Sequence, residues 1–188
     1  MRIILASESP FRKHALDLLG LQYETIPSQI DESLIVHNDL YVRAEMLSQA
    51  KAKKVGELHG DAIIIAADLF VIHDGKIFEK PKDMVEAKEM LASFSGTALE
   101  IVTGFAVYNS GTQKLLSSFD VCRVLFRTLN NFEINDYITR YPVLKCAAGF
   151  EADGLLRFAE HIEGSYNFKA ALPVNRLIEF LRENEVAV

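Results

Sequence analysis

The chain has 188 residues, of which 49% are hydrophobic and 24% are charged, and its formal net charge is −6. It has enough apolar side chains for a buried core, which argues against a disordered protein, and no apolar run is long enough to span a bilayer. The acidic net charge argues against a broad basic face that wraps nucleic acid, so any phosphate site has to be local.

Hydrophobic periodicity predicts that strands and helices alternate along the chain. Continuous apolar runs indicate buried strands, and apolar residues at helical spacing indicate amphipathic helices. Ser9 followed by Pro10 is typical of an N-cap and a first helical residue. In chain order we expect a strand at 2–6, a helix at 10–20, a strand at 22–26, a helix at 38–58, strands at 63–67 and 69–72, a turn at 73–76, a short strand that ends before 80–81, a helix at 84–94, paired strands at 99–109 and 114–127, a helix at 132–140, a loop at 146–154, a strand at 158–162 and a helix at 174–183.

These elements are expected to form one domain over residues 1–188. No internal repeat, low-complexity segment or flexible linker divides the sequence. We expect an α/β fold with a mixed sheet, in which an N-terminal half and a C-terminal half form two lobes around a cleft. The sequence has no secretory segment and only two cysteines, Cys122 and Cys146. It therefore favours a cytoplasmic protein whose cysteines are small buried hydrophobic residues.

Asp68 interrupts the apolar run from Ile63 to Ile72. An ionised carboxylate that is buried without a partner costs several kcal/mol, so its presence in such a run needs a reason. One interpretation is a residue at the mouth of a strand that is hydrogen-bonded to the backbone. We favour the other, a catalytic base or metal ligand at the carboxyl end of a buried strand, where sites form in α/β proteins.

Several cations are candidates for a phosphate site. Arg12 and Lys13 follow the start of the expected helix at 10–20, where free N–H groups and the helix dipole favour an anion. Solvated surface charge is the alternative for both residues. Lys51, in the run QAKAKK, is typical of a solvated helix face when taken alone, whereas Lys80 is more constrained because it lies between a strand and a proline.

Other chemistry finds little support in the sequence. Glu32, in the loop segment DES, is suited equally to capping the next helix and to binding a metal. The five histidines lack ligand spacing, and neither CxxC nor HExxH occurs, so zinc is not expected. The sequence also lacks GxxxxGK[ST], GxGxxG and GxSxG, which leaves a P-loop, a dinucleotide fold and a serine hydrolase without support.

Six segments, in order and over almost the whole chain, resemble the Maf family of nucleoside triphosphate pyrophosphatases. The opening LASESPFRKHALDLLG is similar to the family's LASxSPRRxxLLxxxG, and AADLFVIHDGKIFEKP is similar to AADTxVxxxGxxxxKP. DES and AKAKK match its acidic loop and its Lys-Ala helix. EAKEMLASFSG with IVTG, and HIEGSYNFKAALPVNRL, are similar to EAxxMLxxLSG with VxTG and to xIxGSYxNVxGLPxxxL.

The resemblance implies a Maf- and ITPase-like fold with an elongated, twisted sheet flanked by helices. It implies Mg²⁺- or Mn²⁺-dependent hydrolysis between the α- and β-phosphates of a nucleotide, and it suggests a homodimer. Asp68 would orient or deprotonate the attacking water, and Glu32 with Asp68 would hold the metal. The residues implied in phosphate binding are Ser7, Ser9, Arg12, Lys13, Lys51 and Lys80.

The chain departs from the commonest family pattern at three places. Phe11 stands where that pattern has an arginine, Leu69 stands where it has a threonine, and the loop LKCAAGFEADG replaces DKAGAYGIQG. These differences resemble the branch that acts on 7-methyl-GTP. Phe11, or Phe150 in the loop, is a candidate to bind the methylated base through a cation–π contact, worth roughly 0.5–2 kcal/mol. Packing of Phe11 against the core is the alternative.

The two other departures bear on the same site. Leu69 cannot form the hydrogen bond of the usual threonine, so it bears on base preference. Glu151 and Asp153 are the candidates to replace the Asp and Gln of the family loop.

We therefore expect a cytoplasmic nucleoside triphosphate pyrophosphatase that prefers 7-methyl-GTP and has no nucleic-acid polymer or membrane as a partner. Hydrolysis of dTTP and UTP is the alternative within the same chemistry. A non-catalytic, nucleotide-binding regulator of septum formation is the alternative from another class. The retained Arg12, Glu32, Asp68 and Lys80 favour an enzyme.

Overall fold

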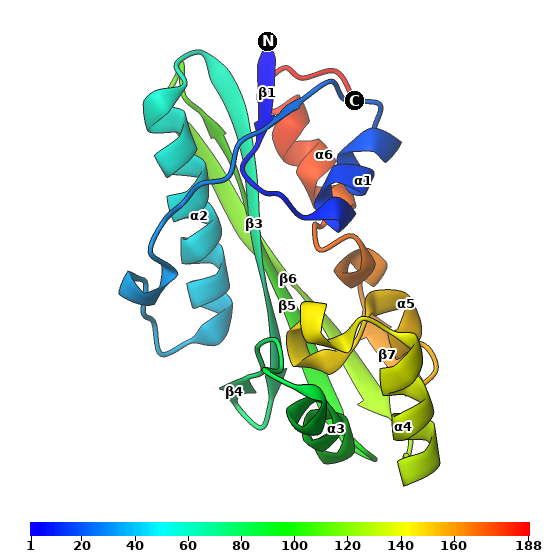
Figure 1. The fold of residues 1–188 in the computed structure, drawn as a ribbon. Coiled ribbons are helices and arrows are strands. Elements are labelled where there is room, and N and C mark those ends of the chain that lie inside the picture. Colours follow the sequence, from blue (N-terminus) through cyan, green and yellow to red (C-terminus); the bar gives the residue numbers. More distant parts are fainter. The chain divides into compact units, whose positions relative to one another are not determined.

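The computed structural model describes residues 1–188, apart from the side chain of Tyr166. Its seven strands form one mixed sheet in the order β2-β1-β3-β5-β6-β7, and β4 pairs with β3 (Figure 1). The α/β class and the mixed sheet are thus confirmed. The elements are β1 (Arg2–Leu5), α1 (Pro10–Leu18), β2 (Glu24–Thr25), η1 (Glu32–Leu34), α2 (Leu40–Leu58), β3 (Ala62–His73), β4 (Lys76–Ile77), α3 (Met84–Ser93), β5 (Ala98–Asn109), β6 (Lys114–Phe126), α4 (Asn131–Arg140), η2 (Val143–Lys145), η3 (Ala147–Gly149), α5 (Ala152–Leu155), β7 (Ala159–Gly164), η4 (Tyr166–Lys169) and α6 (Val174–Arg182).

The chain divides into two compact units, but not into the two sequence halves that we expected. The first unit contains Met1–Leu69, Thr103–Asp120 and Asn167–Val188, and the second contains Phe70–Val102 and Val121–Tyr166. The division by halves is wrong because β3, β5 and β6 each begin in one unit and end in the other. The cleft expected between two lobes stays a prediction.

The core of the first unit lies on both faces of its part of the sheet. β1 pairs in parallel with β3, with Ile3 opposite Ile63 and Ile4 opposite Ile64. Because side chains alternate along a strand, Ile3 and Ile63 face α1 and α6, whereas Ile4 and Ile64 face α2. Figure 1 shows α2 on one side of β3 and the helices α1 and α6 on the other.

The α2 face of the sheet is lined by small residues. Its buried cluster joins strand residues and Ala6, which directly follows β1, to Ala52 and Val55 of α2; the strand residues are Ile4, Ala62, Ile64, Ala66 and Ala106. Short side chains let a helix approach a sheet closely, so this face sets α2 near the strands.

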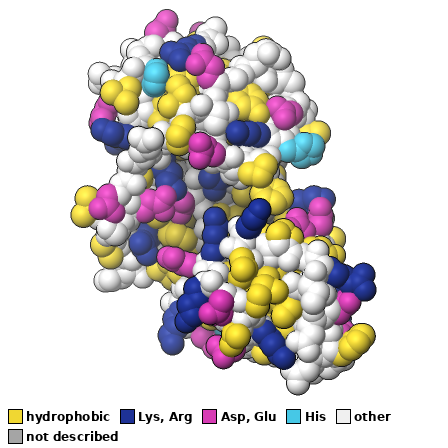
Figure 2. Space-filling view, in the orientation of Figure 1, with side chains coloured by type: hydrophobic (Ala, Val, Ile, Leu, Met, Phe, Trp, Pro, Cys, Tyr) yellow, Lys and Arg dark blue, Asp and Glu magenta, His cyan; other side chains and the backbone are white. Residues whose placement is uncertain are grey.

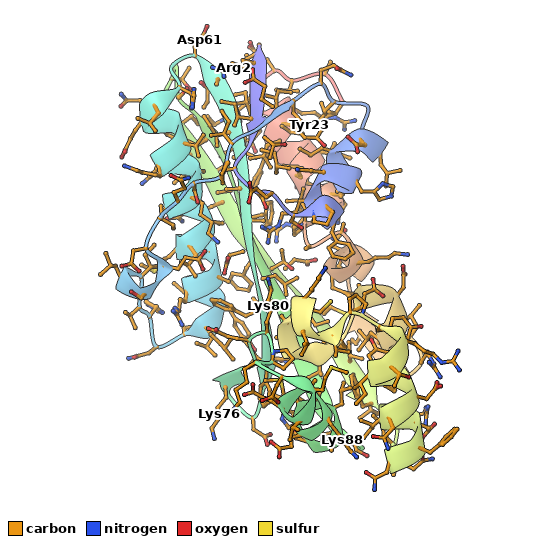
Figure 3. All side chains as sticks on the ribbon, in the orientation of Figure 1. Arg2, Tyr23, Asp61, Lys76, Lys80 and Lys88 are labelled. Atoms are coloured by element: carbon orange, nitrogen blue, oxygen red, sulfur yellow. The ribbon has the colours of Figure 1, made fainter. Side chains whose placement is uncertain are left out.

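The N-terminal strands and α1 are tied together by polar contacts. Arg2 of β1 forms an ion pair with Glu24 of β2, with 2.7 Å between Nη2 and Oε2. The Tyr23 hydroxyl lies 3.0 Å from the Lys13 carbonyl oxygen and 2.9 Å from Asp17 Oδ1. Figure 3 labels Arg2 and Tyr23. The ion pair thus joins β1 to β2, and Tyr23 ties α1 to the residues directly before β2.

The core of the second unit is an aromatic cluster. The ring of Phe94 makes edge contacts with Phe78, Phe126 and Phe150, at centroid distances of 5.0, 5.8 and 6.3 Å. His73 packs on Phe94 as well and lies 2.9 Å from Thr97 Oγ1 through Nε2. Edge-to-face packing of this kind adds to the burial of apolar area.

Two local expectations are corrected by the structure. Asp68 lies inside the continuous strand β3, so it is neither at the mouth nor at the carboxyl end of a strand. A lysine from α2 pairs with its carboxylate within the strand. Ser9 occupies the N-cap position of α1 ahead of Pro10, yet its side chain makes no capping hydrogen bond.

The remaining sequence expectations concern cysteines and membrane spans. Cys122 is buried as expected, whereas Cys146 is only half-buried, and neither forms a disulfide. Across the described residues, no helix has the length and apolar character that a membrane span requires.

Candidate active site

The ammonium of Lys51 joins two carboxylates of the first unit. Its Nζ atom lies 2.5 Å from Asp68 Oδ1 and 2.8 Å from Glu32 Oε1. The side chains of Lys51 and Asp68 are each 11% exposed, whereas that of Glu32 is 53% exposed. α2, β3 and η1 therefore bring together three residues that the sequence separates by up to 36 positions. Lys51 is not part of a solvated helix face.

The charge of Asp68 depends on its neighbours. Burial raises the pKa of this carboxyl group, and the nearby charge of Glu32 raises it further. The charges of Lys51 and Arg12 lower it. The ammonium is thus the partner that a carboxylate inside an apolar strand requires.

Arg12 is held by two acceptors. Its Nε atom donates to the carbonyl oxygen of Ala171 at 3.0 Å, and Nη1 donates to Ser7 Oγ at 3.1 Å. Burial lowers the pKa of the guanidinium, while the carboxylates of Asp68 and Glu32 act in the opposite direction. Arg12 and Lys51 thus place two positive charges near two carboxylates in one unit.

Ser7 has a role that the sequence does not reveal. Its hydroxyl oxygen accepts hydrogen bonds from Arg12 and from the backbone N–H of Ser9, the latter at 3.2 Å. The hydroxyl therefore orients the guanidinium and the first turn of α1. Direct contact of Ser7 or Ser9 with a phosphate stays a prediction.

Ala171 is a position beside Arg12 that was not among the candidates from the sequence. Its φ is 49°, in the left-handed region, where a Cβ atom is unfavourable. The signal was present, because Ala171 stands where the motif GSYxNVxGLP has glycine. This strained residue presents the carbonyl group that binds Arg12.

We expect Ala171→Gly to stabilise the protein by up to about 1 kcal/mol, since glycine adopts the left-handed conformation without strain. The matched control is Ala170→Gly, because Ala170 has no positive φ and should lose stability on this change. Urea unfolding of both variants measures the difference. If Ala171→Gly lost as much stability as Ala170→Gly, the backbone of Ala171 would not be strained.

The other candidates of the first unit lie on α1 and β3. Lys13 is half-buried on α1, and Leu69 is half-buried on β3 directly after Asp68. Phe11 is 41% exposed, which argues against the alternative that its ring packs into the core. A base-selecting role for Phe11 and Leu69 stays a prediction.

Lys80 and Phe150 belong to the second unit. Lys80 is exposed and is labelled in Figure 3, and the carbonyl group of the preceding residue, Glu79, accepts the N–H of Ala148 at 2.9 Å. Phe150 is 6% exposed and packs on Phe94 and Phe126, so its ring belongs to the core of that unit. Its contact with a base, like the phosphate contact of Lys80, stays a prediction.

The two candidate replacements for the family loop residues lie at the start of α5, with Glu151 as its N-cap residue. The side chain of Glu151 caps this helix, since it accepts from the N–H groups of Asp153 and Gly154 at 3.0 and 2.9 Å. Asp153 is exposed in the first turn. The Glu151 carboxylate is thus engaged by backbone N–H groups of its own segment.

Glu32 and Asp68 fit a magnesium or manganese ion that also binds substrate phosphates. Both carboxylates contact the same Lys51 ammonium, so both lie within reach of one cation. Within the described part of the chain, no three His, Cys, Asp or Glu residues form a metal-binding group. Mg²⁺ is commonly bound by one or two carboxylates together with substrate phosphates, and the donor set is of this kind.

The face of the protein in Figure 2 carries both basic and acidic side chains. Lys and Arg side chains alternate there with Asp and Glu, without one broad basic area. The fold and the site define an α/β protein in which Lys51 and Arg12 lie near the carboxylates of Asp68 and Glu32.

Comparison with known proteins identifies the family. The model of the family described as Maf-like protein matches residues 2–184, so the chain belongs to the Maf-like family. A 7-methyl-GTP pyrophosphatase from Hydrogenovibrio crunogenus is 37% identical over 98% of this chain and 94% of its own. A dTTP/UTP pyrophosphatase from Geobacter is 34% identical over 96% and 94%, and one from Bacillus cytotoxicus is 35% identical over 97% and 95%.

Among solved structures, the chain is similar to a HAM1 protein from Coxiella burnetii. The identity is 16% and the TM-score 0.49, over 97% of this chain and 99% of that chain.

Proposed function

We propose that this protein is a nucleoside triphosphate pyrophosphatase, which hydrolyses the anhydride between the α- and β-phosphates to a monophosphate and pyrophosphate. The observation that carries the proposal is the buried pair of Lys51 and Asp68 beside Arg12, in a chain of the Maf-like family. Relatives over nearly the whole chain are named pyrophosphatases.

Each residue has a proposed role in this reaction. Arg12, Lys13, Lys51 and Lys80 supply positive charge to the triphosphate, and Ser7 keeps the guanidinium of Arg12 oriented. Asp68 accepts a proton from the attacking water as the anhydride opens and pyrophosphate leaves. Because burial raises the pKa of Asp68, its carboxylate is more basic than an exposed one, which favours this role.

Mg²⁺ or Mn²⁺ is the proposed cofactor, with Glu32 and Asp68 as its protein ligands. When bound, it would neutralise phosphate charge and polarise the phosphoryl oxygens. We expect EDTA to abolish pyrophosphate release, and added Mg²⁺ or Mn²⁺ to restore it. Full activity after dialysis against EDTA, with metal content checked by mass spectrometry, would contradict a divalent cofactor.

A panel of nucleotides tests the activity itself. The protein is incubated with Mg²⁺ and 7-methyl-GTP, GTP, dTTP, UTP, CTP or ATP, and released pyrophosphate is measured. Release from at least one nucleotide supports the enzyme. Nucleotide binding without any release would favour the alternative of a regulator of septum formation.

We propose 7-methyl-GTP as the preferred substrate, with dTTP and UTP as the alternative. The names of the relatives divide between these substrates, so the support comes from Phe11. Phe11 is 41% exposed and lies one residue before Arg12, where we propose that its ring meets a cationic base.

Replacing Phe11 tests this preference. We expect Phe11→Leu to lower the ratio of kcat/KM for 7-methyl-GTP to that for UTP by about 2- to 30-fold, which corresponds to the roughly 0.5–2 kcal/mol of a cation–π contact. Phe132→Leu, at an exposed position of α4, is the matched control. A higher kcat/KM for UTP than for 7-methyl-GTP in the unchanged protein would count directly against the Phe11 argument.

The remaining proposals concern setting and assembly. We propose a cytoplasmic protein that acts on free nucleotides and assembles as a homodimer. Light scattering on the purified protein gives its mass directly, and a single species at the monomer mass of 21.1 kDa would exclude the dimer.

A further inference from the structure

The strand β5 approaches the backbone of α2 at Gly104. A Cβ atom at this position would lie 2.1 Å from the carbonyl oxygen of Ala44, 2.2 Å from its carbonyl carbon and 2.5 Å from the backbone nitrogen of Glu45. All three are backbone atoms of a helix, which cannot rotate away as a side chain does. Only glycine is therefore compatible with the observed distance between β5 and α2.

The position of α2 at Gly104 also determines the position of Lys51. Ala44 and Lys51 are seven residues apart, about two helical turns, so they lie on the same face of α2. Both are buried, as are Ser48 and Val55 on that face. A helix moves as a rigid element over two turns, so a displacement at Ala44 displaces the side chain of Lys51 as well.

The partner of Lys51 is fixed to the same sheet. Asp68 lies on β3, and β5 is the hydrogen-bonded neighbour of β3. Lys51 Nζ and Asp68 Oδ1 are 2.5 Å apart, and a separation beyond about 3.2 Å would leave the range of a normal hydrogen bond. A shift of α2 by about 1 Å would therefore stretch the contact beyond this range unless the flexible stem of Lys51 follows the carboxylate.

Gly56, near the carboxyl end of α2, also lies close to β5, but its neighbours are side-chain atoms and not backbone atoms. A Cβ atom at Gly56 would meet Tyr108 Cε1 at 2.5 Å and Cδ1 at 2.6 Å, both in a half-buried side chain. A tyrosine ring adjusts more readily than a helix backbone. Gly56, on α2, is therefore the comparison for Gly104, on β5.

We propose that Gly104, in the segment IVTG, is a positioning residue for the Lys51–Asp68 pair: its missing side chain sets how closely α2 approaches the sheet and so brings the ammonium to the carboxylate. The inference rests on the proposed function for its catalytic consequence. Its structural consequence can be measured without that function.

The test compares Gly104→Ala with two controls. Gly56→Ala changes a glycine on α2, and Leu177→Ala removes core volume on the opposite face of the sheet, where Leu177 is fully buried. Each variant is assayed for kcat and KM of pyrophosphate release, for Tm, and for acetylation of Lys51 by acetic anhydride, quantified by peptide mass spectrometry. The exposed Lys53 and Lys54 are internal references on the same helix.

We expect Gly104→Ala to lower kcat at least 10-fold and to increase acetylation of Lys51 at least 5-fold relative to Lys53 and Lys54. Leu177→Ala should lower Tm while its kcat and its Lys51 acetylation stay within about 2-fold of the unchanged protein. Gly56→Ala, which meets a side chain and not a helix backbone, should change both values less than Gly104→Ala does. Unchanged Lys51 acetylation in folded Gly104→Ala overturns the proposal. An equal fall of kcat in Leu177→Ala at the same loss of Tm overturns it as well.

A second variant keeps the proposal testable if Gly104→Ala does not fold. Ala106→Val adds volume to the next buried position of β5 on the α2 face, against side chains of α2. Faster acetylation of Lys51 in this folded variant supports the inference, and an unchanged rate contradicts it. If the unchanged protein releases no pyrophosphate from any nucleotide, the proposed function fails, while the acetylation measurement still decides the role of Gly104.

Discussion

Asp68→Asn is expected to lower kcat for pyrophosphate release by about 10²–10⁴-fold, the range that a positioned general base contributes. The amide has the shape of the carboxylate but cannot accept a proton from water or carry a negative charge. Its oxygen still accepts from Lys51, so the fold should persist. The measurement is a steady-state assay with the best nucleotide of the panel, beside a thermal melt.

Asp61→Asn is the matched control for this change. Asp61 lies in the same unit, is exposed and has a φ of 54°, a conformation that asparagine tolerates. It removes the same charge away from the site and should leave kcat unchanged. An Asp68→Asn protein as active as this control would exclude Asp68 as the base.

Lys51→Met is expected to destabilise the protein by about 3–5 kcal/mol, because it leaves the carboxylate of Asp68 buried without its partner. For a chain of this size the loss corresponds to a fall in Tm of about 6–20 °C. Lys54→Met, on the exposed side of the same helix, is the control and should cost about 1 kcal/mol or less. A Lys51→Met protein as stable as this control would show that the pair contributes nothing.

The double variant Lys51→Met with Asp68→Asn separates the loss of the pair from the loss of the lysine. We expect it to regain part of the lost stability, since a neutral amide is easier to bury than a lone carboxylate. A double variant less stable than Lys51→Met alone would contradict a penalty from the unpaired charge.

The stability that Lys51→Met loses is expected to increase with pH. The folded-state pKa of Asp68 is already above its ordinary value of 3.8, and removal of Lys51 takes away a charge that lowers it. A raised carboxyl pKa adds stability below 3.8 that is lost as the pH rises through the folded-state value. Urea unfolding in metal-free buffer should therefore show a larger loss at pH 8 than at pH 5.

The secondary structure and the fold class could be predicted from the sequence. Apolar periodicity placed α2, α3, α4 and α6 within about two residues, because these helices bury one regular face. The hairpin of β5 and β6 followed from two apolar runs around a turn.

The site could be predicted less completely, because periodicity does not report long-range contacts. Asp68 was identified by the cost of its burial, but its partner was not, since the local context of Lys51 is typical of a surface helix. Arg12 was identified from its place at a helix start. Its acceptor on Ala171 lies 159 positions further along, beyond any local pattern.

The chain connectivity has a consequence for how the protein is made. The first unit contains both the first and the last residues of the chain, and its core joins Ile3 and Leu5 to Leu177 and Leu181. The second unit ends at Tyr166. On the ribosome, all residues of the second unit are therefore synthesised before α6 exists, and the core around β1 is completed only when α6 emerges. Until then the apolar face of β1 and β3 has no α6 to cover it, so the nascent first unit is the part exposed to aggregation.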